Sequence, residues 1–337
     1  MMDYTRVYTA ELEMRRVDVE TWSDTGDAIP INGLSIAYNA LDTVPLIQTA
    51  SVEVDQAIED GWYRFYLIAT QGEAEKTAIG TFLFTTSRMK HDYGLDQPTA
   101  NGYSVLKPAE LRYFLGGYAP EGSNGAEYAA KLLRECTKAP VIVAGGFTLA
   151  QDVVFQPGTP YLTCVWKLLD AAGFCIAIGG DGTISIDAKP TVAVYELTPS
   201  NIMPEVTEDL STDMPNRYIA VQNGEVAIAE NSAGDNPLSY KTRGYWQEVY
   251  DKAPIRVNGE TLSAYANRKL HEASIRYRKV SYVREFEPGI GAFSAILGNV
   301  PDSGLEGVGR VASGTMDCNN GIIVSETAMF QEDLWTD

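Results

Sequence analysis

The chain has 337 residues, of which 45% are hydrophobic and 21% are charged. This balance is typical of an ordinary soluble globular protein and excludes a disordered or low-complexity chain. The 45 Asp and Glu residues outnumber the 26 Lys and Arg residues and give a formal net charge of −19, which argues against a DNA-binding role because such a surface repels a nucleic-acid backbone. The length suggests two or three domains.

The sequence lacks the usual signs of a membrane span, a secretion signal or a metal site. It has no run of about 18 apolar residues, and its N-terminal segment MMDYTRVYTAELEMRR has no apolar core. We therefore expect the chain to stay in the cytoplasm where it is made and not to insert into a membrane. The cysteines and histidines form no close cluster, so we expect reduced thiols, no zinc site, no cofactor and no Ser-His-Asp triad. These residues are Cys136, Cys164, Cys175, Cys318, His91 and His271.

Residues 1–105 have the character of short β-strands almost throughout. Strand patterns occur in SIAYNA, ASVEVD, WYRFYLIAT and TAIGTFLFTTS, and turns rich in Asp, Gly and Gln separate them. In the segment 63–69 both faces are partly apolar, with Arg64 on one of them, so we expect this strand to be covered on both sides. The spacing predicts a barrel-like or sandwich-like β domain.

Residues 106–198 predict a compact α+β unit of two helices and several strands. Asn124, with Glu127 three residues later, has the arrangement of a capping box at the start of a helix. A second helix is predicted after Thr159 as N-cap and Pro160 as its first residue, with Gly173 just past its end. The apolar stripes of both helices are interpreted as core packing.

The segment FCIAIGGDGTISI, residues 174–186, matches a phosphate-binding signature of diacylglycerol and NAD kinases at Gly179–Thr183. A phosphate loop needs a helix after it, whose N-terminal N–H groups bind the phosphate. The residues that follow instead alternate as a strand does. The pattern therefore predicts a β-hairpin whose glycines form a tight turn, with the kinase as a minor alternative.

Residues 199–337 predict a second β region after a connection rich in Pro, Ser, Thr and Asp. Asn223-Gly224 between two alternating segments is a strong hairpin signal. One helix is expected at about 261–276, and a final pair of strands around Asn319-Asn320-Gly321. This region is therefore predicted to be β with one inserted helix.

The order of these parts resembles the central hub proteins of phage tail baseplates and tail tips, and the related hubs of contractile injection systems. The resemblance is carried by GTPYLTCVWKLLDAAGFCIAIGGDGTISI, PNRYIAVQNGEVAIA and TLSAYANRKLHEAS. It implies an α+β, mostly β fold in which two β-barrel-like tube domains flank a small α+β domain. On that resemblance residues 1–105 are the first tube domain, 106–198 the middle domain, and 199–337 the second tube domain with its inserted helix.

Such hubs are structural scaffolds of the virion. The resemblance implies a homotrimeric, pseudo-sixfold ring that joins the hexameric tail tube, or a distal tail protein, above to the trimeric spike or tip below. The genomic DNA would pass through it without specific binding, along an acidic inner wall, and the tape measure protein is a further candidate partner. The ring would be assembled in the host cytoplasm.

Besides the kinase, one other function remains open from the sequence. A receptor- or glycan-binding tail protein would use aromatic faces to stack on sugars, but the five tryptophans are scattered through the chain. Some relatives of the hubs carry a peptidoglycan-cleaving domain after the hub, and this chain is expected to end too soon to hold one. We therefore expect no enzymatic activity and assign no catalytic, cofactor-binding or metal-binding residues; the binding residues stay unknown.

Overall fold

The computed structural model describes residues 9–40, 46–54, 58–71, 73–92, 95–198, 205–208, 213–234, 236–300, 305–319 and 321–334. Most of the predicted connection after residue 198 lies outside the described residues, as does Trp335. The fold is α+β and mostly β, as predicted.

In the described part of the N-terminal region the secondary-structure elements are all strands, because alternating apolar residues and frequent turn residues favour sheet over helix. The strands are β1 (Thr9–Val17), β2 (Asp24–Pro30), β3 (Gly33–Asn39), β4 (Gln48–Glu53), β5 (Gly61–Gln71), β6 (Glu73–Asp92) and β7 (Leu95–Ser104).

The middle region contains the two predicted main helices with short strands around them. Its elements are α1 (Lys107–Leu111), β8 (Gly117–Ala119), α2 (Gly125–Arg134), β9 (Val141–Val143), β10 (Val153–Phe155), α3 (Tyr161–Ala171), β11 (Phe174–Ile178) and β12 (Ile184–Ala188). The side chain of Asn124 caps α2 by accepting hydrogen bonds from the N–H groups of Ala126 and Glu127, as predicted.

The start of α3 differs from the prediction by one residue. Pro160, and not Thr159, is the N-cap, and its side chain makes no capping hydrogen bond. The cause is tertiary pairing, since the N–H of Tyr161 donates to the carbonyl of Arg112 at 2.9 Å and the N–H of Phe114 to that of Thr159 at 2.8 Å. This pairing keeps residues 159 and 160 extended. The helix ends as predicted, with Gly173 at a φ of +69° just beyond it.

The C-terminal region begins with β13 (Tyr195–Leu197) and β14 (Glu205–Glu208). It continues through β15 (Arg217–Gln222), β16 (Glu225–Glu230), α4 (Tyr240–Arg243), β17 (Glu248–Asp251), α5 (Leu262–Ala273), β18 (Ile275–Glu285), β19 (Ala295–Val300), β20 (Leu305–Asp317) and β21 (Ile323–Asp333). The hairpin at Asn223-Gly224 and the inserted helix, α5, are confirmed.

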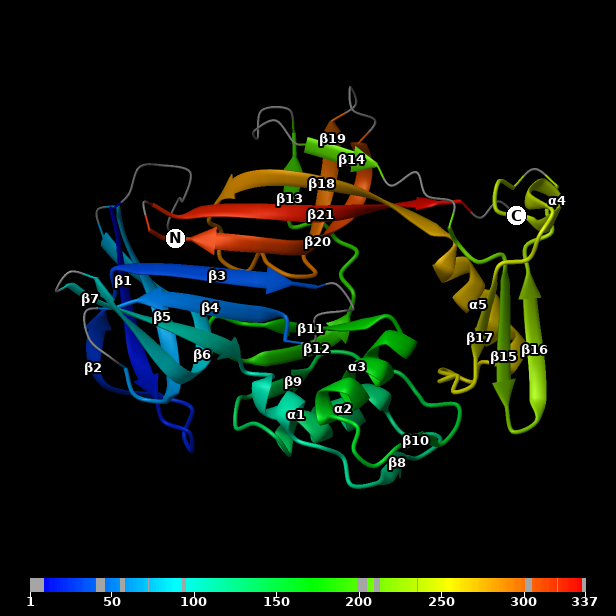
Figure 1. Ribbon diagram of the computed structural model, residues 1–337, viewed down its shortest axis with the longest axis horizontal. Helices are drawn as coiled ribbons and strands as arrows, with labels where there is room; N and C mark the ends of the chain where they lie inside the picture. The colour runs from blue at the N-terminus through cyan, green and yellow to red at the C-terminus, as the bar shows by residue number, and fades with distance from the viewer. Residues whose placement is uncertain are drawn as a thin grey trace.

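A single 13-stranded sheet, here called the long sheet, joins the two ends of the chain (Figure 1). Its main path runs in the order β14-β18-β21-β20-β3-β4-β7-β6-β5-β1-β2. The N-terminal and C-terminal strands meet where β3 pairs antiparallel with β20, and this pairing is called the seam. The described strands form no closed barrel, so the barrel-like form of the two tube domains is not found, and the domain boundaries stay a prediction.

Residues 213–274 form a small unit with its own sheet, called the lobe, within the region predicted as the second tube domain; its residue Val257 packs into the core of the middle region. Its three-stranded sheet has the order β16-β15-β17, and α5 covers one face. The lobe has its own core, formed by Tyr218, Ala220, Ala229, Leu262, Tyr265, Ala266 and Leu270. The helix α5 covers one face of this sheet and supplies part of its core. This explains why one helix is predicted inside a region that is otherwise β.

A buried ion pair lies beneath the seam. The carboxylate of Glu326 in β21 accepts hydrogen bonds from Nε and Nη2 of Arg284 in β18, both at 2.7 Å. These side chains are 0% and 1% exposed, respectively. Tyr282 donates to Glu326 at 2.6 Å, and the hydroxyl of Tyr38 in β3 also donates to it. The charge therefore has partners from both sides of the seam.

The backbone register places these groups in one row across four strands. Tyr282 is paired with Glu326, Glu326 with Gly314 in β20, and Gly314 with Tyr38. A Cβ on Gly314 would lie 2.6 Å from the ring of Tyr38. The absence of a side chain at this position therefore lets Tyr38 reach across β20 to the carboxylate.

The pKa shifts in this row follow from burial and from the charge of Glu326. Burial raises the pKa of the Tyr38 and Tyr282 hydroxyls well above the usual range, and the nearby carboxylate raises both further. Burial alone would lower the pKa of the Arg284 guanidinium, but the hydrogen bonds and the charge of Glu326 raise it. Each group is thus held in one protonation state.

We predict that Glu326→Gln destabilises the protein by about 3–5 kcal/mol, because it leaves Arg284 buried without a counter-charge. Urea denaturation followed by tryptophan fluorescence measures the change. Glu332→Gln on the same strand is the matched control: its carboxylate pairs with Arg276 near the surface, so its loss should cost at most about 1 kcal/mol. Equal effects of the two variants would contradict a special role of the buried pair.

We also predict a loss of stability at alkaline pH. Tyr38 and Tyr282 have pKa values that are raised on folding, so their contribution is complete below the unfolded value of about 10 and declines as the pH rises above it. Thermal unfolding between neutral and alkaline pH should show this decline, and Tyr38→Phe should make it shallower. Tyr245→Phe, at an exposed tyrosine, should leave the slope unchanged.

Candidate functional site: a docking turn and an uncharged sheet face

The segment Gly179–Thr183 is a turn between two strands. β11 and β12 pair antiparallel, with Ile178 opposite Ile184. The N–H of Gly182 donates to the carbonyl of Gly179 at 2.9 Å, and Gly182 has a φ of +82°. The predicted hairpin is confirmed, and no helix follows whose N-terminus could bind a phosphate. The kinase interpretation therefore loses the element on which it depends.

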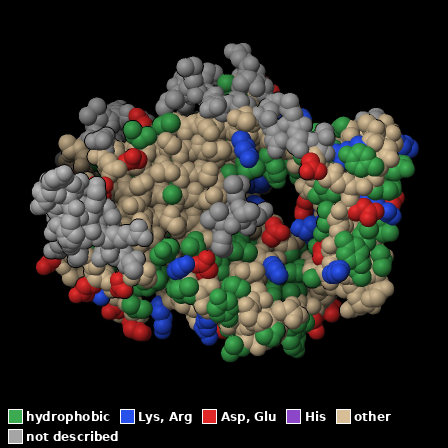
Figure 2. Space-filling model, viewed as in Figure 1, with side chains coloured by type: hydrophobic (Ala, Val, Ile, Leu, Met, Phe, Trp, Pro, Cys, Tyr) green, Lys and Arg blue, Asp and Glu red, His purple; other side chains and the backbone are tan. Residues whose placement is uncertain are grey.

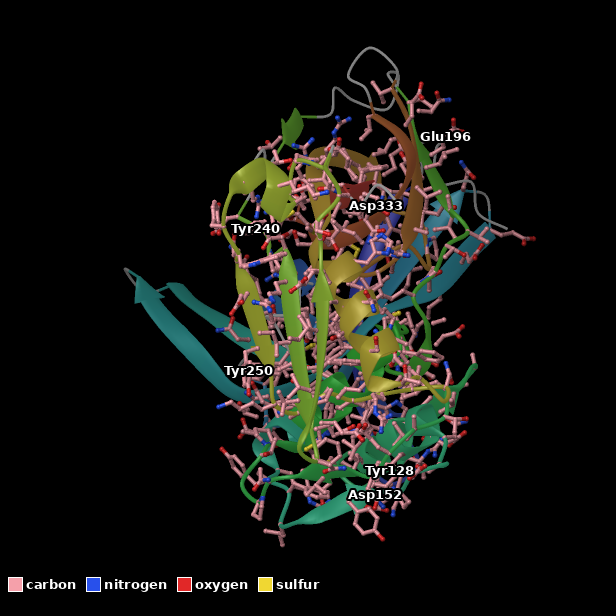
Figure 3. All side chains as sticks on the ribbon, turned by 90° about the vertical axis from the view of Figure 1, so that its right-hand side faces the viewer. Tyr128, Asp152, Glu196, Tyr240, Tyr250 and Asp333 are labelled. Carbon is pink, nitrogen blue, oxygen red and sulfur yellow. The ribbon has the colours of Figure 1, made fainter. Side chains whose placement is uncertain are left out.

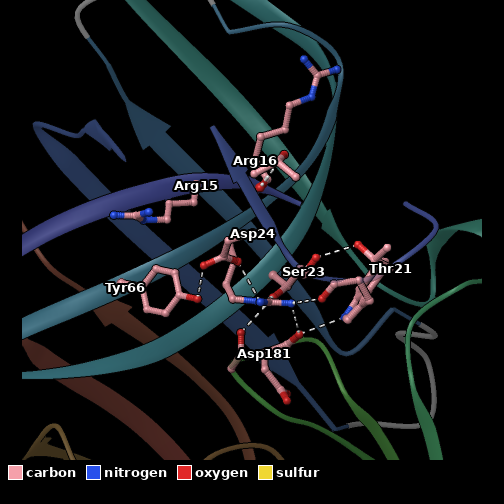
Figure 4. A network of polar contacts seen from close by, with 12 residues as sticks. Arg15, Arg16, Thr21, Ser23, Asp24, Tyr66 and Asp181 are labelled. Atoms are coloured by element: carbon pink, nitrogen blue, oxygen red, sulfur yellow. Dashed lines mark hydrogen bonds and ion pairs between the residues drawn. The ribbon is translucent and has the colours of Figure 1, made fainter. Parts of the chain in front are cut away.

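The turn docks the middle region onto the long sheet through its backbone carbonyls (Figure 4). The carbonyl of Asp181 accepts from Nη2 of Arg64 and from Nε1 of Trp22, both at 3.0 Å. The carbonyl of Gly180 accepts from the hydroxyl of Thr81 at 2.9 Å. Arg64 also donates to the carboxylate of Asp24 at 2.8 Å. These contacts bury Arg64 and bear out the expectation that β5 is covered on both sides.

The carboxylate of Asp181 is used within the turn. It accepts from the N–H of Thr183 at 2.9 Å and from its hydroxyl at 2.8 Å. An aspartate that closes its own turn is common structural chemistry. Asp181 therefore serves local geometry, and the loop offers carbonyl oxygens, not N–H groups, to its neighbour.

A broad part of the long sheet has an uncharged outer face, here called the neutral face. It crosses the seam and covers β18, β21, β20, β3 and β4. Figure 2 shows it as a wide tan area with few charged side chains. Its residues line a hollow of about 640 Å³ and include Ala37, Asn39, Gln48, Thr49, Ser281, Val283, Ser313, Thr315, Ser325 and Thr327.

Strand alternation explains the composition of this face. In β21 the residues Val324, Glu326 and Ala328 are buried, while Ser325 and Thr327 point outward. Hydroxyl groups bind water or a passing polar group equally well, and they add no net charge. The face also carries exposed charged side chains, Glu53 and Asp317 at the ends of β4 and β20 and Lys279 in the middle of β18. The face thus offers weak, interchangeable hydrogen bonds.

The cysteines and His271, also singled out from the sequence, form no reactive or metal-binding group in the structure. The four cysteines are free thiols, and burial raises the pKa of Cys175 to about 11. His271 lies 2.7 Å from a carboxylate oxygen of Asp333. Within the described part of the chain, no cluster of three His, Cys, Asp or Glu side chains could hold a metal ion. No described helix is long and apolar enough to cross a membrane.

Sequence reasoning missed the charged residues that hold the parts together. Arg64, Arg284 and Glu326 lie in segments whose pattern is that of an ordinary strand. A signal was present, because each falls in line with apolar residues that alternate inward, as Glu326 does between Val324 and Ala328. A charged residue at an inward-facing strand position requires a buried partner, but the sequence pattern does not identify that partner.

We predict that Gly180→Ala destabilises the protein by about 1–3 kcal/mol, the usual cost of forcing atoms into a packed site. A Cβ on Gly180 would lie 1.9 Å from the carbonyl oxygen of Ala78, so the turn would have to move off the sheet. Gly291→Ala is the control, since a Cβ there meets no atom within 4 Å. Chemical denaturation of both variants measures the change in the free energy of unfolding. An unchanged midpoint for Gly180→Ala would contradict the docking contact.

No protein-family model matches the chain, and no curated protein matches it in sequence. Solved structures do match its fold. The tail protein from Neisseria meningitidis MC58 is 12% identical, with a TM-score of 0.68 over 96% of this chain and 97% of that chain. The 43 kDa tail protein of prophage MuSo2 from Shewanella oneidensis is 11% identical, with a TM-score of 0.62 over 95% and 98% of the two chains.

A third match lies outside phages. The Escherichia coli protein c3393 is described as a type VI secretion component with structural similarity to the T4 bacteriophage tail proteins gp27 and gp5. It is 9% identical, with a TM-score of 0.53 over 97% of this chain and 78% of that chain. The predicted resemblance is confirmed at the level of the fold: nearly the whole chain folds like known phage tail proteins.

Proposed function

We propose that the chain is a structural hub of a phage tail baseplate or tail tip, without enzymatic activity. The observation that carries the proposal is the seam, which makes one continuous sheet from the two ends of the chain. Three such subunits would contribute six β regions to a ring, so a threefold protein can face a sixfold tube. The likeness to phage tail proteins supports this function by analogy of fold.

In this proposal the hub is a homotrimer that joins the hexameric tail tube, or a distal tail protein, to the trimeric spike or tip. The tape measure protein is a further partner in the channel. The location is the tail baseplate or tip of the virion, after assembly in the host cytoplasm. The matched proteins described as tail and type VI secretion components support these partners as a class.

The neutral face is the part of the sheet that we assign to the inner wall. The sequence led us to expect an acidic wall, whereas this face is built from hydroxyl and small side chains around a hollow. DNA affinity comes mainly from Lys and Arg groups that displace counterions. A wall with few of these groups lets the genome pass without sticking, and it does so without needing repulsion.

A receptor- or glycan-binding tail protein is the alternative. It needs exposed aromatic faces, but Trp22 and Trp62 contact each other with ring centroids 5.3 Å apart, and Trp166 packs against Phe293. Trp246 is stacked on Tyr240 at 4.5 Å. Because these tryptophan rings pack against other rings of the same chain, they are less available to stack on a sugar. This favours the hub over the glycan-binding protein.

We predict that the purified protein forms a trimer of 110.4 kDa, three times the chain mass of 36.8 kDa. Light scattering and native mass spectrometry over a range of concentrations measure the mass. Electron microscopy of the trimer should then show a ring whose inner wall is the neutral face. A monomer at every concentration would contradict the ring, and a trimer with the neutral face outside would contradict the conduit alone.

A further inference from the structure

The dipeptide Asn-Gly occurs six times in the chain. It is the dipeptide in which asparagine loses its side-chain amide most readily, because glycine has no Cβ to obstruct its own backbone nitrogen. Asn320 of the last pair lies outside the described residues, so the structure allows a comparison of the other five. Their asparagines are Asn32, Asn101, Asn124, Asn223 and Asn258.

Deamidation requires a bond between two neighbouring residues. The backbone nitrogen of the glycine loses its proton to hydroxide and attacks the side-chain amide carbon, Cγ, of the asparagine. The amide carbon–nitrogen bond then breaks, the nitrogen leaves with a proton as ammonia, and a succinimide ring remains. Water opens this ring to aspartate or to isoaspartate, whose main chain runs through the former side chain. The asparagine must therefore be free to rotate until the glycine nitrogen reaches Cγ.

In two of the five pairs a hydrogen bond holds the asparagine side chain. The side chain of Asn124 caps α2, and the N–H of Gly125, which would attack it, donates to the carbonyl of Phe147 at 2.8 Å. The side-chain oxygen of Asn258 accepts from the N–H of Thr148 at 3.0 Å, and the N–H of Asn258 donates to the carbonyl of Thr148 at 2.7 Å. Rotation at either asparagine would break these bonds.

In two other pairs the long sheet holds the backbone. Gly102 lies in β7 with a partner in β4 on one side and in β6 on the other. The N–H of Asn32 donates to the carbonyl of Glu53 at 2.9 Å, and the buried Gly33 pairs with the same Glu53. Asn101 and Asn32 therefore cannot rotate unless part of the sheet opens.

The fifth pair, Asn223-Gly224, is the turn of the hairpin between β15 and β16 (Figure 1). Figure 3 views the molecule from the side of the lobe, where these two strands run together. Both turn residues are exposed, and a Cβ on Gly224 would meet no atom within 4 Å. The side chain of Asn223 makes no hydrogen bond in the described part of the chain. The turn can therefore rotate without breaking a contact outside itself.

We propose that Asn223 is a site of spontaneous deamidation in the folded protein, and that the fold protects the other four described pairs. Each hydrogen bond that must break before the attack slows the reaction by roughly a factor of ten. The product places a negative charge beside Glu225. Isoaspartate also lengthens the main chain of a two-residue turn, whose length sets the register of β15 with β16. The site exists whether or not the chain forms the proposed ring.

The test follows the five asparagines in the purified full-length protein, kept folded at mildly alkaline pH. Tryptic digestion and mass spectrometry of samples taken over several days give one rate for each site. We expect Asn223 to react at least about ten times faster than each of the other four. The control is the same protein in urea, where the five rates should become similar. Asn223→Gln should remove the fast reaction and leave the other rates unchanged, because glutamine would have to close a larger ring.

Three results would overturn the assignment. A folded chain in which Asn223 reacts as slowly as Asn124 and Asn258 would show that the hairpin turn itself resists the attack. Equal and fast rates at all five sites in native buffer would show that the fold gives no protection. A ranking that persists unchanged in urea would show that the flanking residues, and not the fold, select the site.

Discussion

The buried pair of Arg284 and Glu326 is the constraint on which the architecture depends. Its hydrogen bonds reach β3 through Tyr38 and β18 through Tyr282, with β20 and β21 between them. A slip of one residue at the seam would turn Tyr38 to the opposite face. The buried carboxylate would then lose one of its donors. The row therefore specifies one register for strands that are far apart in the sequence. The burial of Arg284 and Glu326 is tolerated because the two charges are paired with each other.

The register of the seam in turn defines the surfaces of the molecule. Once Tyr38 and Glu326 point inward, their neighbours along the strands point outward, and these are uncharged residues: Ala37, Asn39, Ser325 and Thr327. The neutral face is thus the outer side of the same row that holds the sheet together. The turn at Gly179–Thr183 adds a second junction, in which Arg64 and Thr81 bind carbonyls of the turn. Both junctions use single polar groups that have full sets of partners.

Local features could be predicted from the sequence because local chemistry determines them. Asn124 caps a helix, Gly182 permits a turn and Asn223-Gly224 forms a hairpin, each through residues that lie a few positions apart. The order of such elements was enough to predict the likeness to tail hubs. The seam could not be predicted, because Tyr38 and Glu326 are separated by 288 positions and many strands would fit by pattern alone. The lobe was missed because its strands have the same local pattern as those of the long sheet, and only the pairing of the strands shows that they form a sheet of their own.

The distribution of charge also needs the structure. A net charge of −19 led us to expect an acidic channel wall, but net charge says nothing about which face carries it. The long sheet has a broad outer face with few charged side chains although the molecule as a whole is acidic. If this face is the inner wall of the proposed ring, its small number of charges would avoid both attraction and repulsion of a passing polyanion, and the acidity of the chain would serve the rest of the surface.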